Sequence, residues 1–339
     1  MASNVPSPAS LATVVVVAWN GADLIRPCLD ALAAQAHTGQ FETWVIDNAS
    51  TDDTAAIVAM HPVAPRLITL ETNLGFAGAA ELAVRDATTP FVVLLNQDAR
   101  PEPGWLAALM APLTTLNSRG VGAVTSKVLF ADDGRINNTA VVVGPDGYGH
   151  DRGFGEPDDG RYADAEDVFA FSGTAAAVRV VAAREVGSFD PSFFLYYEDT
   201  DLSWRLQLAG WRIRYEPRAV VRHLHAASSD ISSASFAFHN ERNRLLMLVK
   251  CAPALLAVKE VLRFIAITVL IPGRRIAGVK IPREHQFRTS VRLHVLRSFA
   301  QQLPSTLAKR RAMTSVARRP RAEVARSLGQ ATAPPPSAR

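Results

Sequence analysis

The sequence predicts an α/β fold with a mostly parallel central sheet. Two observations lead to this prediction. Residues 13–95 alternate short apolar, β-branched runs with helically spaced segments, the order expected of βαβ units. The apolar runs show no polar alternation, which is typical of strands that are buried on both faces.

The alternation can be followed element by element. The expected strands are Thr13–Val17, Phe41–Asp47, Arg66–Glu71 and Phe91–Leu95. Helical spacing is expected over Ala22–Gln35, after a cap at Asp52 or Asp53, and over Gly78–Asp86. Right-handed crossovers between such strands place helices on both faces of the sheet.

Polar or Gly-containing segments follow all four strands. They are Trp19-Asn20-Gly21, Asp47-Asn48, Asn73-Leu74-Gly75 and Asn96-Gln97-Asp98. Open parallel sheets bind ligands at the carboxyl ends of their strands. The four segments are therefore predicted to form one site.

The second half of the chain is less regular. A mobile loop rich in Gly and Asp is expected over Pro145–Asp167, and a helix from about Thr200 to Ala209. Trp211–Tyr215 and Ala219–Val221 are typical of short strands, and helical spacing begins at Ser232.

Composition restricts the functional classes. The two cysteines, Cys28 and Cys251, are too few for a disulfide scaffold, and residues 1–10 do not have the pattern of a signal peptide. Residues 272–339 carry 15 Lys and Arg against two Asp and Glu, so an anionic partner is expected for the C-terminus. Ala252–Pro272 is apolar but interrupted by charges, as in an interfacial helix.

Seven motifs occur in a fixed order along the chain. They are VVVVAWNG (14–21), VIDNASTD (45–52), NLGFAG (73–78), LLNQD (94–98), FSGTA (171–175), VGSFD (186–190) and FFLYYEDTDL (193–202). Together they resemble family 2 glycosyltransferases, in particular their rhamnosyltransferase-like branch, from about residue 12 to about residue 245.

The resemblance implies a GT-A-type nucleotide-binding fold with a mostly parallel central sheet, followed by a helical, membrane-associating C-terminal segment. The expected organisation is a disordered N-terminus (1–10), a GT-A catalytic domain (11–230), a helical, membrane-associating region (231–300) and a basic, partly disordered tail (301–339).

The resemblance assigns donor and metal residues. Residues expected to bind the nucleotide-sugar donor are Trp19, Asn20, Asp47, Asn48, Asn73, Gly75, Asn96, Arg242 and Arg244. Asp98, with His223, is expected to hold Mg²⁺ or Mn²⁺ against the leaving diphosphate. Three plainer alternatives stay open: turn and cap bonds for Asp47, satisfied surface or core histidines at His223 and His225, and a solvated helix face for the two arginines.

Three acids cluster at the start of the helix that is expected near Thr200, and acids at a helix N-terminus often only cap it. Glu198 and Asp199 also match the catalytic position of the family, which implies a base that deprotonates the acceptor hydroxyl. We assign this role to Asp199, while Glu198 orients the acceptor or is itself the base. Asp201 completes the cluster.

The predicted function is transfer of a sugar, foremost rhamnose from dTDP-rhamnose, to a lipid-linked or polysaccharide acceptor with inversion. The reaction would serve cell-envelope glycan synthesis. The protein is expected in the cytoplasm, peripherally attached to the anionic inner face of the cell membrane. The apolar segment beside the basic tail favours lipid over nucleic acid. Two alternatives are an inactive sugar-nucleotide or membrane-binding protein, and a nucleotidyltransferase, which the lack of a basic Gly-rich loop after the first strand disfavours.

Overall fold

The computed structural model describes residues 10–35, 41–115, 118, 120–224 and 232–330. The strands are β1 (Ala12–Ala18), β2 (Phe41–Asp47), β3 (Arg66–Thr69), β4 (Phe91–Asn96), β5 (Ala99–Pro101), β6 (Val121–Phe130), β7 (Ile136–Asn138), β8 (Val141–Val143), β9 (Gly149–Asp151), β10 (Glu166–Val168), β11 (Ala175–Arg179) and β12 (Arg212–His223). The helices are α1 (Ile25–Ala33), α2 (Thr54–Ala59), α3 (Gly75–Asp86), α4 (Trp105–Thr114), α5 (Val180–Glu185), α6 (Glu198–Leu208), α7 (Ala234–Cys251), α8 (Ala254–Ile276), α9 (Thr289–Val316) and α10 (Arg321–Ala325), with 3₁₀ turns η2 (Pro191–Phe193) and η3 (His285–Phe287).

One large sheet runs through the molecule in the order β10–β12–β6–β11–β4–β1–β2–β3, with β5 beside β12 and β7 beside β6. The strands β3, β2, β1 and β4 are parallel neighbours, and β6 is parallel to β12. Antiparallel β11 joins these two parallel groups. The predicted mostly parallel α/β sheet is therefore confirmed.

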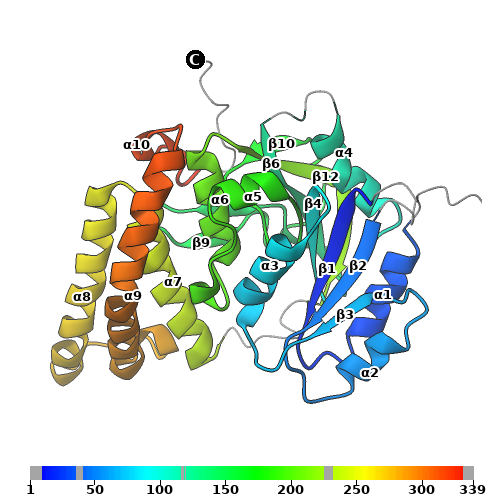
Figure 1. The fold of residues 1–339 in the computed structure, drawn as a ribbon. Coiled ribbons are helices and arrows are strands. Elements are labelled where there is room, and N and C mark those ends of the chain that lie inside the picture. Colours follow the sequence, from blue (N-terminus) through cyan, green and yellow to red (C-terminus); the bar gives the residue numbers. More distant parts are fainter. Residues whose placement is uncertain (1–9, 36–40, 116–117, 119, 225–231, 331–339) are drawn as a thin grey trace, which may run out of the picture.

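Both faces of this sheet are covered, as the apolar strands require (Figure 1). Val14 and Val16 of β1 pack into a core with α1 and α4, while Val15 packs into a second core with α3. Alternate side chains of a strand point to opposite faces, so a strand between two helical layers needs apolar residues throughout.

One local expectation is narrowed to one of its two residues, and two others need correction. The carboxylate of Asp52, and not that of Asp53, accepts a hydrogen bond from the N–H of Thr54, at 3.1 Å, at the start of α2. The two short strands expected around Tyr215 and Val221 are one strand, β12, with a register shift between Glu216 and Val220. The expected loop over residues 145–167 contains β9, which forms a hairpin with β8, and most of β10.

The C-terminal helices form a layer at one edge of the molecule (Figure 1). The second half of α7 is buried on all sides, and both α8 and α9 pack against it. The boundary expected at residue 300 falls inside α9, and α10 follows, so residues 301–330 are not a loose tail. Residues 1–9 and 331–339 of the two expected disordered ends lie outside the described residues, as does His225. Among the helices described, none is long and apolar enough to cross a membrane.

Candidate active site

The four strand-end segments meet at one edge of the sheet, as predicted. The side-chain amide of Gln97, after β4, bonds both main-chain groups of Trp19, after β1: it accepts from the N–H at 3.0 Å and donates to the C=O at 3.1 Å. The side chain of Asn48, after β2, accepts from the N–H of Leu74 at 2.8 Å. These bonds tie loops that are distant in sequence into one surface.

A cavity of about 990 Å³ opens above this surface. Nine of the predicted site residues line it: Trp19, Asn48, Asn73, Gly75, Asn96, Asp98, Glu198, Asp199 and His223. Its other walls come from the strands β7, β8 and β9, the segment 172–174 and the start of α7. The cavity has room for a ligand larger than a single sugar.

Two further predicted donor residues shape the rim without lining the cavity. Asn20 accepts a hydrogen bond from the N–H of Thr51 at 2.8 Å, and its own N–H donates to the hydroxyl of Ser50 at 2.9 Å. Asp47 is buried and accepts from the N–H of Ser50 at 3.2 Å. Asp47 thus makes the turn bond of its plainer alternative, while Asn20 ties the loop after β1 to the loop that presents Asn48.

Asp98 and His223 form a buried pair at the floor of the cavity. Asp98 follows β4 and His223 ends β12, and pairing of β5 with β12 brings these ends together. The imidazole Nε2 lies 3.1 Å from Oδ1 of Asp98, and Nδ1 lies 3.3 Å from Oδ1 of Asn137. A carboxylate and an imidazole are chemically suited to a divalent cation, with Asn137 orienting the ring. In the described ranges, however, no group of three or more His, Cys, Asp and Glu side chains converges on one point, so a cation here would need further ligands from a bound diphosphate or water.

The three acids at the start of α6 have separate roles. Asp201 is fully buried and pairs with Arg205 at 2.7 Å, a structural contact. Asp199 faces the cavity and accepts hydrogen bonds from the N–H of Gly173 at 2.8 Å and the hydroxyl of Thr200 at 3.0 Å. Glu198 also lines the cavity, and its buried Oε2 has no hydrogen-bond partner among the residues that the structure describes. Capping therefore does not account for Glu198.

The electrostatics favour proton chemistry at these acids. Burial raises the pKa of Asp199, although hydrogen bonds from Gly173 and Thr200 oppose the shift. Burial, together with the charge of Asp199, raises the pKa of Glu198 well above its usual value. A carboxyl with a raised pKa holds its proton near neutral pH and can donate a hydrogen bond, while its neighbour acts as a base.

Asp151 is a site residue that the sequence did not indicate. It lies on β9 and lines the cavity, and it interacts electrostatically with both Asp199 and His223. Although the side chain is open to the cavity, the surrounding protein and the charge of Asp199 raise the pKa of Asp151 to about 6. The expectation of a loop at residues 145–167 concealed this residue, and its local sequence contains no distinguishing signal.

An aromatic segment forms one wall of the cavity. Phe194, Tyr196 and Tyr197 all have positive φ angles, which is costly for bulky residues. The side-chain amide of Asn243 holds the segment, because it donates to the carbonyl groups of Phe193, Leu195 and Tyr196 at 2.7–2.9 Å.

Arg242 and Arg244 do not line the cavity, so their expected contact with the donor is absent from this arrangement. The guanidinium of Arg242 donates to the carbonyl groups of Ser192 and Phe193, at 3.1 and 2.8 Å, and so supports the aromatic segment. Arg244 is buried and pairs with Glu241 at 3.1 Å. Buried guanidinium groups need partners, and here carbonyls and carboxylates of the protein supply them.

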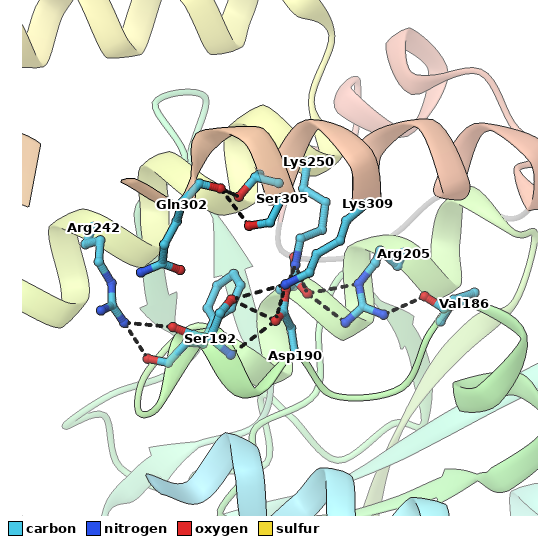
Figure 2. Close-up of polar contacts among 12 residues, drawn as sticks. Val186, Asp190, Ser192, Arg205, Arg242, Lys250, Gln302, Ser305 and Lys309 are labelled. Atoms are coloured by element: carbon cyan, nitrogen blue, oxygen red, sulfur yellow. Dashed lines mark hydrogen bonds and ion pairs between the residues drawn. The ribbon is translucent and has the colours of Figure 1, made fainter. Parts of the chain in front are cut away.

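A buried ionic network lies behind the aromatic segment (Figure 2). Lys250 of α7 contacts Asp190 at 2.5 Å and Asp201 at 3.0 Å, and Lys309 of α9 reaches Asp190 at 2.7 Å. Burial disfavours the charge of Asp190, but the two lysines outweigh it and hold the pKa of this carboxyl well below its usual range. The network joins α7 and α9 to the first turn of α6, next to Asp199.

Two solved structures share the fold of this chain. The mannosyltransferase PcManGT from Pyrobaculum calidifontis, in complex with GDP-Man and Mn²⁺, is similar with a TM-score of 0.51 and 21% identity, over 94% of this chain and 79% of that chain. GalNAc-T7 with UDP, GalNAc and Mn²⁺ is similar with a TM-score of 0.60 and 13% identity, over 88% and 58%. The fold is that of the GT-A-type glycosyltransferases.

The chain belongs to glycosyl transferase family 2. Residues 13–187 match the family described as glycosyl transferase family 2. Residues 158–237 match a second family, which is described as glycosyl transferase family group 2. An N-acetylglucosaminyl-diphospho-decaprenol L-rhamnosyltransferase of Mycobacterium tuberculosis is 28% identical over 60% of this chain and 72% of its own length. The O-antigen biosynthesis protein RfbC of Myxococcus xanthus is 26% identical over 64% of this chain but only 17% of its own length, so this chain spans a small part of that relative. The expected rhamnosyltransferase-like resemblance is confirmed.

Proposed function

We propose that this chain transfers a deoxyhexose, rhamnose from dTDP-rhamnose, to a lipid-linked or polysaccharide acceptor in cell-envelope glycan synthesis. The observation that carries the proposal is the cavity in which two carboxyl groups of raised pKa, Asp199 and Glu198, share the walls with the Asp98–His223 pair. The choice of sugar rests on the name of the mycobacterial relative, a rhamnosyltransferase with a diphospho-decaprenol acceptor.

The transfer proceeds in one in-line step with inversion. The Asp199 carboxylate takes the proton of the acceptor hydroxyl, and the acceptor oxygen bonds the anomeric carbon as the bond from that carbon to the diphosphate oxygen breaks. Protonated Glu198 donates a hydrogen bond that orients the acceptor. The nucleoside diphosphate leaves with the bonding electron pair.

Asp98 and His223 are the residues that would hold Mg²⁺ or Mn²⁺, with Asn96 nearby on the cavity wall. Such a cation supplies positive charge that stabilises the leaving diphosphate. The Mn²⁺ in the two solved transferases named above supports this assignment.

A donor-cleavage screen tests the proposal. The purified chain, with Mg²⁺ or Mn²⁺, is incubated with dTDP-, UDP- and GDP-sugars, and release of the nucleoside diphosphate is measured. We expect metal-dependent cleavage of dTDP-rhamnose, lowered about 10²- to 10⁴-fold by Asp199→Asn and strongly by Asp98→Asn. Asp133→Asn, a change of an exposed acid outside the cavity, is the matched control.

The outcomes separate the candidates. Cleavage of another donor would replace rhamnose and keep the transferase. Donor binding without cleavage calls for the same assay with a polyprenyl-diphosphate-linked acceptor. The absence of both donor binding and turnover would overturn the proposal in favour of an inactive binding protein.

We further propose that the chain works at the cytoplasmic face of the cell membrane, peripherally attached to anionic lipid through its C-terminal helices. The excess of Lys and Arg in residues 272–339 supports this location, because anionic lipid attracts clustered cations. A membrane location would place the cavity near a lipid-linked acceptor.

A further inference from the structure

The helix α8 has apolar residues on two sides. Its inner side packs Ala257, Phe264 and Ile271 against the neighbouring helices, where each is at most 5% exposed. Its outer side presents Leu255, Val258, Leu262, Val269 and Ile276, which are 87, 56, 59, 71 and 89% exposed. We call these five residues the outer stripe. Their spacing of three, four or seven residues places them on one face of the helix.

The outer stripe has nothing to pack against within the described chain, since α8 lies at the outer edge of the molecule (Figure 1). Contiguous apolar surface of this kind on a folded protein marks an interaction site. A helix of 23 residues is about 35 Å long, so the stripe is an extended, narrow surface and not a pocket.

Positive charge borders the outer stripe. Lys259 and Arg263 have side chains that are 73 and 42% exposed, and Arg274 and Arg275 are exposed in the last turn. The single acid of α8, a helix described over its whole length, is Glu260, which is 2% exposed and bonds Arg263 at 2.7 Å. The solvent-facing side of the helix is therefore apolar and cationic.

This charge distribution distinguishes between two occupants. In a two-fold dimer the same patch meets itself, so cations from both copies would converge with no exposed acid on α8 to balance them. An anionic bilayer offers negative headgroups above an apolar layer, which complements both features of the helix.

We propose that α8 lies in the plane of an anionic lipid bilayer, with the outer stripe inserted below the headgroups and Lys259, Arg274 and Arg275 in contact with them. The inference gives the proposed membrane location a specific surface, and it rests on that part of the proposed function alone. Donor cleavage in solution does not depend on it.

Vesicle binding tests the proposal. The full chain is sedimented with vesicles of phosphatidylcholine, with and without phosphatidylglycerol. We expect binding that requires phosphatidylglycerol and weakens as salt is added, because screening removes the contribution of the cations. The triple variant Leu255→Gln/Leu262→Gln/Val269→Gln should bind at least about tenfold more weakly. The charge variant Lys259→Gln/Arg274→Gln/Arg275→Gln should lose the preference for phosphatidylglycerol.

The matched control is the double variant Met60→Gln/Val181→Gln, which removes two apolar side chains that are 75 and 64% exposed and lie outside α8. It should bind vesicles as the unchanged chain does. Circular dichroism and donor cleavage in solution verify that each variant is folded. Vesicle binding by the triple variant that equals binding by the unchanged chain would overturn the proposal. The proposal would also be overturned if the unchanged chain self-associates in sedimentation velocity and binds no vesicles, while the triple variant no longer self-associates. Neither result would alter donor cleavage, so failure of this inference is distinguishable from failure of the transferase.

Discussion

At the scale of single residues, the chemistry of the site depends on carboxyl groups close enough to alter one another. Asp199 has a raised pKa because it is buried, and Asp151 faces it across the cavity. A base must be ionised to accept a proton, so activity should rise with pH through the pKa of Asp199. That acid limb is expected above about pH 3.9, the ordinary value for Asp.

Asp199→Asn should lower the pKa of Asp151. Burial and the negative charge of Asp199 together raise the pKa of Asp151 to about 6, and the substitution removes that charge. We expect the pKa of Asp151 to fall by about half to one unit, measured by NMR titration of its side-chain carboxyl. An unchanged pKa of Asp151 would show that the two carboxyl groups do not interact across the cavity. Asp133→Asn serves as the control, since that acid lies outside the cavity lining.

Single residues also show what sequence can and cannot predict about a site. Asp98 and Asp199 were predicted because strand ends and ordered motifs are visible in sequence, and both line the cavity. Arg242 and Arg244 were assigned to the donor because the resemblance places basic residues near the diphosphate, and guanidinium suits phosphate. Their partners, carbonyls of Ser192 and Phe193 and the carboxylate of Glu241, are set by tertiary packing that no local pattern reveals.

At the scale of elements, the start of α3 and the aromatic segment fit closely together. Gly75 has φ +69°, and a Cβ there would lie 2.1 Å from the carbonyl oxygen of Phe194. The same oxygen accepts a hydrogen bond from the N–H of Ala77 at 3.1 Å. Glycine at residue 75 is thus explained by close backbone packing, besides its place on the cavity wall.

Gly75→Ala should lower stability by about 1–3 kcal/mol and weaken donor turnover. The added methyl group would push the aromatic segment away and disturb the adjoining Glu198 and Asp199. Gly104→Ala is a matched control: Gly104 has φ +83°, but nothing lies within 4 Å of its Cβ position, so only backbone strain is added. Urea unfolding and donor cleavage measure the two effects, and equal losses for both variants would contradict the role given to close packing.

The ionic network of Figure 2 leads to a second prediction for the elements. Lys250→Met leaves Asp190 and Asp201 buried with fewer cations, so the free energy of unfolding should fall by about 3–5 kcal/mol. Lys309→Met should cost far less, since its side chain is 39% exposed and solvent screens the contact. Urea unfolding of both variants measures this difference, and a larger loss for Lys309→Met would show that α9, rather than α7, anchors the network.

At the scale of the whole molecule, the fold was predictable wherever the pattern is local. Phe41–Asp47 forms a strand with the expected bounds, and the other early strands differ at their ends by one or two residues. Sequence did not reveal antiparallel β11 between two parallel groups or the hairpin of β8 and β9, because strand order depends on pairings between distant segments. The C-terminal third was predicted to be a helical region followed by a partly disordered tail, because its positive charge is the strongest signal in the sequence. Its structure depends instead on the packing of its helices against one another and against the rest of the chain.

Truncation tests that last conclusion. Removing the residues after Ala300 should prevent stable folding, because the lost segment packs against the ends of α6 and α7. In that segment the N–H groups of Arg318 and Arg319 donate to the carbonyl of Leu208, at the end of α6, at 2.8 and 2.9 Å. The guanidinium of Arg310 donates to the carbonyls of Val249 and Ala252 at 2.7 and 2.8 Å.

The matched control is a chain that ends after Gln330, which keeps all of these contacts. We expect this chain to melt within about 2 °C of the full chain, and the shorter chain to be insoluble or to melt at least about 10 °C lower, as loss of several kcal/mol requires. A soluble chain of residues 1–300 with an unchanged melting temperature and full donor cleavage would show that residues 301–330 are a dispensable appendage. Lys309, one residue before Arg310, contacts Asp190 beside the aromatic segment. This contact argues that residues 301–330 are part of the catalytic domain.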